Sequence, residues 1–236
     1  MYKNKTLLII LTYNEEKSIE TVIRNSKEFL NPNKILVIDG YSTDKTCSVA
    51  RANDADVVCI DKIFGIGLSV EVGLLEAHLG DYDYLIRVDG DNQHTISDVK
   101  KIYDNAIKEN IDLMIGSRFI GNSDYRPNIL RNFGIILLRK MIEIIYDFKV
   151  LDCTSGCQII SKKLIKEIES DENFEYSEVG IICKTIMSKL SIKEEFINMK
   201  PRMSGVSSFN LQNSFIYMFR NMLSIITSFS FKSKKR

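Results

Sequence analysis

The sequence predicts an α/β protein with a mainly parallel, twisted sheet flanked by helices. Two observations carry this prediction: short apolar, β-branched runs recur through the first half of the chain, and segments with a helical spacing of apolar residues separate them. Strands that alternate with helices favour βα units, whose strands run parallel. The expected strands are residues 6–11, 35–38, 56–60, 84–88 and 112–115.

The helical segments between these strands follow polar residues that suit a helix start. Residues 19–30 form the first, and Ser42 and its neighbours offer N-cap side chains for a helix that ends near Ala52. Further helices are expected at residues 68–79 and 97–108. Right-handed crossovers place the loops after parallel strands along one edge of the sheet, where ligands bind in open α/β folds. The polar residues after the strands are therefore the site candidates.

The second half continues without an internal repeat, low-complexity tract or linker, so one domain over residues 1–236 is expected. Its expected elements are a long helix at 128–148, a strand at 157–160, a helix at 162–168, a helix up to Lys189, a strand at 193–197, a loop at 200–208 and a final helical stretch at 215–231.

Composition excludes several classes of protein. The chain has 32 basic and 31 acidic residues, so a strongly basic nucleic-acid binder is not indicated. Its five cysteines form no Cys-x-x-Cys pair and its only histidines are His78 and His94, which disfavours a zinc site and favours a reducing, cytosolic compartment. The six-residue apolar run near the N-terminus is too short for a signal peptide or membrane anchor.

An acidic cluster, Asp89-Gly-Asp-Asn-Gln93, directly follows the strand expected at 84–88. Two carboxylates and a carboxamide are hard oxygen ligands that suit Mg²⁺ or Mn²⁺, and Gly90 allows the sharp turn that keeps both carboxylates together. The structural alternative is a strand-ending turn with local caps. Tyr13 to Glu15 and Asp39 also follow strands, so we expect them at the same edge.

Six motifs follow one another along the chain: Leu11-Thr-Tyr-Asn-Glu-Glu16, Val37-Ile-Asp-Gly-Tyr-Ser-Thr-Asp44, Asp89-Gly-Asp-Asn-Gln-His94, Gly116-Ser-Arg118, Asp152-x-Thr-Ser-Gly156 and Arg202-x-x-Gly-x-Ser207. In this order they resemble the motif series of family 2 glycosyltransferases, most closely the dolichol-phosphate (polyprenyl-phosphate) mannosyltransferase type. The resemblance implies a GT-A fold, a nucleotide-sugar donor and inversion at the anomeric carbon, with residues 1–118 as the donor half, 119–210 as the acceptor half and 211–236 as a C-terminal amphipathic helix with a basic tail.

The resemblance implies that Asp89, Asp91 and Gln93 bind the metal, with Asp91 in the catalytic set. Asp39 would recognise the base or ribose, and Glu15 would hydrogen-bond the nucleoside; a strand-end turn and a helix first turn are the respective structural alternatives. The complete set implied to bind the donor is Leu11, Tyr13, Glu15, Ile38, Asp39, Asp89, Gly90 and Arg202.

The acceptor side rests on arginines. The resemblance suggests that Arg118 and Arg131, both assigned to the catalytic set, face an anionic acceptor phosphate, a role suited to the guanidinium fork; surface salt bridges are the alternative. A sugar hydroxyl acceptor would need a general base, for which Asp152 and Glu178 are candidates, whereas a phosphate is already anionic. For Glu178 a role in capping a helix, or as a solvated carboxylate, is favoured over that of a base. For His94 a supporting or exposed position is expected.

Three departures from the family pattern concern the donor. Gly40-Tyr41 stands where Asp-Gly is common, Ile66 stands where lysine is frequent, and Thr95-Ile96 replaces two prolines. The identity of the sugar and the base therefore stays open.

Residues 215–231 are apolar but are interrupted by Arg220 and Asn221, which makes them too short to span a bilayer. With the basic tail 232–236, the segment either lies in a membrane interface or packs on the core. We therefore expect a cytoplasmic protein that can sit on the membrane surface.

The leading hypothesis is a metal-dependent, inverting hexosyltransferase that moves a sugar from GDP-mannose or a UDP-hexose to a polyprenyl or dolichyl phosphate. One alternative is transfer to a growing surface or capsular glycan. Another is a nucleotidyltransferase or a non-catalytic nucleotide-binding module, since a fold alone does not fix function. The sequence gives no indication of oligomeric state.

Overall fold

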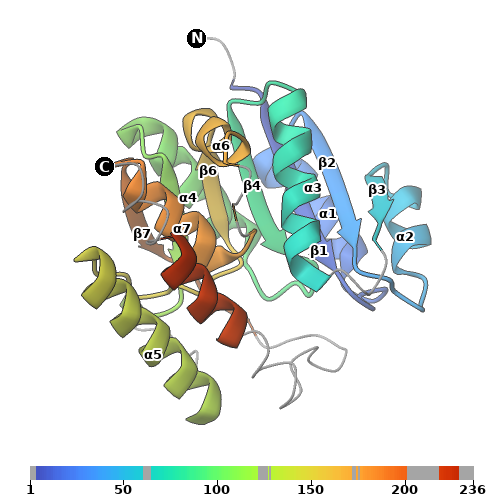
Figure 1. Ribbon diagram of the computed structural model, residues 1–236. Coiled ribbons are helices and arrows are strands. Elements are labelled where there is room, and N and C mark those ends of the chain that lie inside the picture. Colours follow the sequence, from blue (N-terminus) through green and yellow to red (C-terminus); the bar gives the residue numbers. More distant parts are fainter. Residues whose placement is uncertain are drawn as a thin grey trace.

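A sheet of seven strands forms the centre of the protein (Figure 1). The computed structural model describes residues 4–60, 65–121, 127, 129–171, 174, 176–200 and 218–228. The strands are β1 (Thr6–Thr12), β2 (Lys34–Asp39), β3 (Asp56–Cys59), β4 (Tyr84–Asp89), β5 (Leu113–Ser117), β6 (Gln158–Ser161) and β7 (Ile192–Phe196), in the spatial order β3-β2-β1-β4-β6-β5-β7. The strands expected from the sequence are confirmed.

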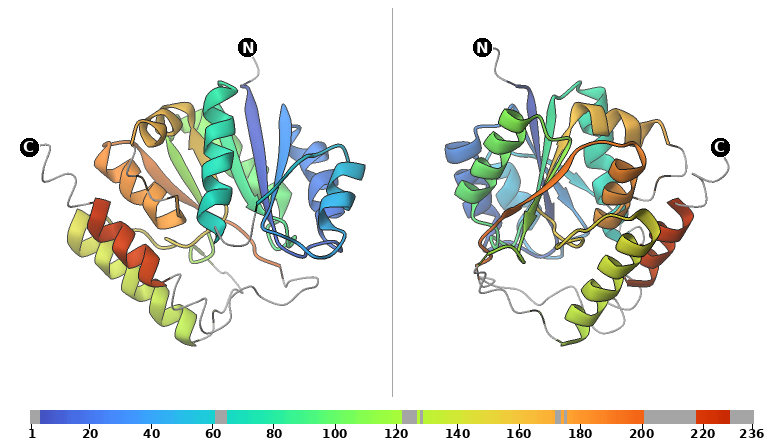
Figure 2. Two further views of the ribbon diagram at one scale, coloured as in Figure 1. Left: turned by 45° about the vertical axis from the view of Figure 1, so that its right-hand side comes forward. Right: turned by 90° about the vertical axis from the view of Figure 1, so that its left-hand side faces the viewer.

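Helices cover both faces of this sheet because alternate strand residues point to opposite sides. On one face Leu7 and Ile9 pack with α3, α5, α6 and α7; on the other Leu8 and Ile10 pack with α1, α2 and α4 (Figures 1 and 2). The helices are α1 (Ile19–Asn25), α2 (Thr46–Ala52), α3 (Gly65–Leu79), α4 (Ile96–Glu109), α5 (Ile129–Tyr146), α6 (Lys162–Glu169) and α7 (Glu178–Met187), and residues 218–228 are also helical.

The helix expected at residues 19–30 changes its winding halfway. After α1 the chain continues as a π-helix, η1 (Ser26–Leu30), which ends where the Asn31 amide donates to the Ser26 carbonyl. The Ser26 hydroxyl donates to the Val22 carbonyl at 2.7 Å, one turn back. A serine that bonds the i−4 carbonyl competes with the regular helix ladder, which accounts for the wider turn.

The strand β6 runs against its neighbours. It pairs antiparallel with both β4 and β5, whereas the other pairings are parallel. The residues that precede β6 therefore lie at the edge where β4 and β5 end. Since β7 is parallel to β5, the residues after β7 reach this edge as well. Strand direction alone thus brings segments from both halves of the chain to the carboxyl ends of β1, β2 and β4.

A buried ion pair lies between the sheet and α7. Arg87 on β4 donates to Glu178, the first residue of α7, and their side chains are 1% and 6% exposed. The helix N-terminus, capped by the Ser177 hydroxyl, also favours a carboxylate at this position. Glu178 is therefore neither solvated nor available as a general base in this arrangement.

Within the described residues, no helix has both the length and the apolar character needed to cross a bilayer.

Glu178→Gln should lower the free energy of unfolding by about 3–5 kcal/mol, because it leaves the Arg87 charge buried without its carboxylate. Urea denaturation would measure this change. The double variant Arg87→Met, Glu178→Leu should recover most of the loss. As a control, Asp104→Ala breaks the exposed Lys100–Asp104 pair and should cost less than about 0.5 kcal/mol. Equal effects of Glu178→Gln and Asp104→Ala would contradict the prediction.

Candidate active site

The candidate site lies where three neighbouring strands end together. In the parallel register Thr12 of β1 stands opposite Asp39 of β2, and Leu11 stands opposite both Ile38 of β2 and Asp89 of β4. Leu11 and Ile38 are buried in the core on one face of the sheet. The edge predicted from the sequence is therefore present, with Asp39 and Asp89 on either side of β1.

Asp39 is fixed by three hydrogen bonds. Its carboxylate accepts from the Thr12 hydroxyl at 2.8 Å, from the Ser42 amide at 2.8 Å and from the Ser42 hydroxyl at 2.6 Å, and the residue is 1% exposed. Three hydrogen bonds of this kind fix the orientation of a carboxylate. Ser42 positions this carboxylate, a role beyond the helix cap expected for it. Its position three residues after an aspartate is typical of a side-chain turn and was the available signal.

Tyr13 and Glu15 follow β1 at the same edge. The Glu15 amide donates to the Thr46 hydroxyl at 2.8 Å, and the Ser18 hydroxyl donates to the Glu15 carboxylate at 3.0 Å. The Glu15 carbonyl accepts the amides that open α1. Glu15 therefore lies just before α1 and not in its first turn, and its contact with a nucleoside stays a prediction. Tyr13 is half-buried.

The turn after β4 requires a glycine. The Gly90 amide donates to the Leu11 carbonyl at 2.9 Å, and a Cβ at Gly90 would approach Thr12 Cγ2 to 2.5 Å. This close approach brings the acidic cluster against β1. Asp91 is 4% exposed, and its carboxylate accepts the Gln93 amide at 3.0 Å. Asp89 is half-buried, so within this cluster Asp91 is buried and Asp89 is partly accessible to solvent.

The other end of the cluster is joined to the segment after β7. The Gln93 side-chain amide donates to the Lys200 carbonyl at 3.0 Å, and the Lys200 amide donates to the Gln93 carbonyl at 2.8 Å. His94 forms an isolated antiparallel β-bridge with Met199 and is 3% exposed. The exposed position considered for His94 is therefore wrong. Arg202 lies outside the described residues. The assignment of Gln93 to a metal stays a prediction.

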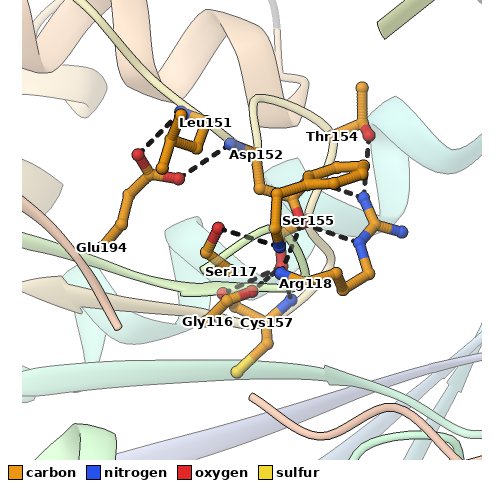
Figure 3. A network of polar contacts seen from close by, with 10 residues as sticks. Gly116, Ser117, Arg118, Leu151, Asp152, Thr154, Ser155, Cys157 and Glu194 are labelled. Carbon is orange, nitrogen blue, oxygen red and sulfur yellow. Dashed lines mark hydrogen bonds and ion pairs between the residues drawn. The ribbon is translucent and has the colours of Figure 1, made fainter. Parts of the chain in front are cut away.

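The segment before β6 lies against Asp89. A Cβ at Gly156 would stand 2.9 Å from Asp89 Oδ1, so only a glycine leaves room for this carboxylate. The Ser155 hydroxyl anchors the segment by donating to the Gly116 carbonyl of β5 at 2.6 Å (Figure 3). Gly156 was quoted in a motif but not assigned a role. Its contact with Asp89 spans the two halves of the chain and has no local sequence signal.

Arg118 is engaged by Asp152. Its guanidinium donates to both carboxylate oxygens, at 2.7 and 2.6 Å, and also to the Thr154 hydroxyl at 2.9 Å (Figure 3). The two side chains are 3% and 0% exposed. The structure therefore shows a buried fork, and a role for Arg118 toward an acceptor phosphate stays a prediction. Both carboxylate oxygens of Asp152 are occupied by the guanidinium, so the geometry does not support Asp152 as a general base.

A second carboxylate supports this fork from β7. Glu194 accepts the backbone amides of Leu151 and Asp152, each at 2.7 Å (Figure 3). Burial raises the pKa of Glu194, and these two hydrogen bonds oppose that shift. Glu194 thus positions the segment that carries Asp152. The sequence pattern of β7 does not indicate that Glu194 positions this segment.

Arg131 lies outside this cluster of contacts. It is exposed in the first turn of α5, a helix that stands beside the sheet layers rather than on the edge (Figure 2). A hollow of about 210 Å³ lies along the same helix and is lined by Ile136, Arg139, Lys140, Glu143, Lys149, Val150 and Leu151. A role for Arg131 toward a phosphate stays a prediction.

Comparison with known proteins establishes the family. Residues 7–169 match the model of glycosyl transferase family 2. This chain belongs to that family and is a glycosyltransferase. It is 27% identical to UDP-N-acetylglucosamine–dolichyl-phosphate N-acetylglucosaminyltransferase of Methanococcus voltae, over 79% of this chain and 82% of that protein. It is 24% identical to polyprenol monophosphomannose synthase of Mycolicibacterium smegmatis, over 92% and 85% of the two chains.

Solved structures confirm the GT-A fold. Glucosyl-3-phosphoglycerate synthase of Mycobacterium tuberculosis aligns with 96% of this chain and 80% of its own, with a TM-score of 0.73 and 19% identity. That protein has also been solved with Mn²⁺ and UDP-glucose. At this identity the similarity establishes the architecture, and the site must be argued from the residues present.

Gly156→Ala should reduce turnover at least about tenfold, equivalent to about 1.4 kcal/mol, because the added Cβ displaces the Asp89 carboxylate. Steady-state release of nucleoside diphosphate would measure the loss, and circular dichroism would verify the fold. Gly134→Ala is the control, since its Cβ meets only the Met218 side chain in the described part of the chain. Turnover of Gly156→Ala equal to that of the control would argue against the assignment of Asp89.

Proposed function

We propose that this glycosyltransferase moves a hexose from GDP-mannose or a UDP-hexose to a polyprenyl or dolichyl phosphate at a membrane surface, with inversion and with Mg²⁺ or Mn²⁺. The observation that carries the proposal is the meeting of Asp39, Asp89 and Asp91 at one edge with the segment 152–156 packed against Asp89. Two relatives whose names specify a lipid phosphate product or acceptor support the choice of acceptor.

The residues present fit a divalent cation. Asp89 and Asp91 supply carboxylate oxygens two residues apart, and the lack of a Cβ at Gly156 lets the Asp89 carboxylate take its position there. Hard oxygen donors of this kind suit Mg²⁺ and Mn²⁺. When bound, such an ion neutralises charge that develops on a leaving diphosphate. Asp89 and Asp91 would hold it, with Gln93 as the proposed third ligand.

The chain's own residues would orient the donor. Asp39, held by Thr12 and Ser42, presents a fixed carboxylate to a ribose or base at the end of β2. Asp152 and Glu178 are both engaged in buried ion pairs, which suits an acceptor that is already an anion and needs no base.

Two adjacent helices offer an apolar surface for the membrane. Helix 218–228 packs beside α5, where Tyr146 donates to the Ile225 carbonyl at 2.9 Å (Figures 1 and 2). The packed position considered for the C-terminal segment is therefore correct for these residues, yet each helix keeps an exposed apolar stripe. We name this the apolar platform: Ile129, Phe133, Ile136 and Ile144 of α5 with Phe219, Leu223 and Ile226 of helix 218–228.

The apolar platform suits a lipid surface more than solvent. Phe133 is 62% exposed and Phe219 is 60% exposed, and both recur with helical spacing beside other apolar residues. Arg139, Lys140 and Lys149 line the hollow along α5 together with Glu143, which pairs with both lysines. The net charge of the lining is positive, which complements anionic headgroups. Since a polyprenyl phosphate stays in the bilayer, an enzyme that uses it must work at this boundary.

Asp91→Ala should reduce turnover at least about a hundredfold, or about 2.7 kcal/mol, while the fold is retained, because a metal ligand is removed. The assay screens nucleotide sugars with Mg²⁺ or Mn²⁺, with and without a short polyprenyl phosphate, and follows nucleoside diphosphate release. The matched control is Asp104→Ala on the surface of α4.

Release that depends on the lipid phosphate would support the proposal and identify the donor. Release that is unaffected by the lipid would refute it in favour of a glycan acceptor. Wild-type rates for Asp91→Ala would refute the metal assignment alone.

The double variant Phe133→Ser, Phe219→Ser should bind vesicles of phosphatidylcholine and phosphatidylglycerol several-fold less than the wild type, because it removes apolar area from the platform. Cosedimentation would measure the bound fraction. Leu79→Ser on α3, which also alters a highly exposed apolar residue, should bind like the wild type. Identical binding by all three proteins would argue against the platform.

A further inference from the structure

Two cysteines that are twelve residues apart meet beside the candidate donor site. Cys47, in the first turn of α2, and Cys59, the last residue of β3, bring their sulfurs to 3.3 Å. In the parallel register Cys59 stands opposite Asp39. One oxygen of Asp39 and the two sulfurs all lie within 4.8 Å of one another. No Cys-x-x-Cys motif announces this pair in the sequence, because the packing of α2 against β3 is what joins the two thiols.

The geometry points to a reversible thiol–disulfide pair, Cys47–Cys59, that responds to hydrogen peroxide and alters the surroundings of Asp39. The sulfurs need to close from 3.3 Å to the length of a disulfide, about 2.05 Å. That movement is small, and Cys59 belongs to a four-residue strand at the edge of the sheet, which has one strand neighbour. The consequence for donor binding rests on the function proposed above.

The two thiols differ in the way such a pair requires. Cys59 is exposed and accepts a hydrogen bond from the Arg51 guanidinium at 3.8 Å, the accessible and positively charged setting in which protein thiols react. Cys47 is half-buried. Burial first, and then the neighbouring Cys59 and Asp39, raise the pKa of Cys47 to about 12. Cys59 is therefore the attacking sulfur and Cys47 the second partner.

The chemistry balances with hydrogen peroxide as the oxidant. The Cys59 sulfur attacks one peroxide oxygen, the O–O bond breaks, and a sulfenic acid and water form. The Cys47 sulfur then attacks the Cys59 sulfur, the S–O bond breaks, and the disulfide forms as a second water leaves. Two thiols lose two hydrogens in all, and a dithiol reductant reverses the change.

The remaining thiols supply an internal control. Cys153, Cys157 and Cys183 are fully buried, and burial raises the pKa of Cys157 and of Cys183 to about 12. They should stay reduced while the folded protein is treated with peroxide. Oxidation of the native chain should therefore stop after the loss of two thiols of five.

The experiment treats the full chain with hydrogen peroxide, blocks the remaining thiols and maps the peptides without reduction. We expect a Cys47–Cys59 cross-linked peptide that dithiothreitol removes. Cys59→Ser should react several-fold more slowly than the wild type, and Cys47→Ser should give a Cys59 sulfenic acid that dimedone traps. A cross-link elsewhere, or reduced thiols at peroxide concentrations that oxidise free cysteine, would overturn the pair.

Nucleotide binding provides a separate measurement. Calorimetry with UDP and with GDP, each with Mn²⁺, should give a several-fold higher Kd for the oxidised wild type than for the reduced form, and no change for peroxide-treated Cys59→Ser. Equal Kd values in both states would overturn the link to the donor site. If neither form binds a nucleotide, the proposed function fails, while the peptide map still decides whether the disulfide forms.

Discussion

The ion pair between Arg118 and Asp152 holds the candidate site together. It joins the end of β5 to the segment that leads into β6, and both charges are almost fully removed from solvent. Buried charges are stable only when they are paired and hydrogen-bonded, so the two segments are fixed relative to each other. Glu194 and the Ser155 hydroxyl tighten the same connection, and Gly156 then comes to rest against Asp89.

The acidic edge, where Asp39, Asp89 and Asp91 lie, carries the negative charge of the candidate site. Asp39 ends β2, Asp89 ends β4 and Asp91 follows it, with β1 between these two strands. Like charges in proximity destabilise a fold unless a cation or a polar ligand compensates them. Binding groups are thus placed at some cost to stability, as is common at functional sites. A cation held there, together with a nucleotide diphosphate, would balance the charge.

One departure from the family pattern, Tyr41, lies in a turn with an unusual backbone conformation. Tyr41 has a φ of 69°, a left-handed conformation that favours glycine, at a position where the family commonly has glycine. Its side chain is 55% exposed next to the turn that holds Asp39. The turn after Asp39 therefore has a left-handed backbone at Tyr41 although the residue is not glycine. This substitution adds an aromatic surface beside the edge that also contains the thiol pair.

The sequence by itself determined the strands, most helices, the GT-A class and the acidic edge, because periodicity, glycine turns and motif spacing are local signals. It did not determine which partner each charged group would take. Arg118 was expected to face a phosphate and Glu178 to be capping or solvated, yet tertiary structure buries them against Asp152 and Arg87. Such pairings depend on the reversed direction of β6 and on the packing of α7. Contacts between residues far apart in the chain leave no periodic trace, so only the folded structure decides them.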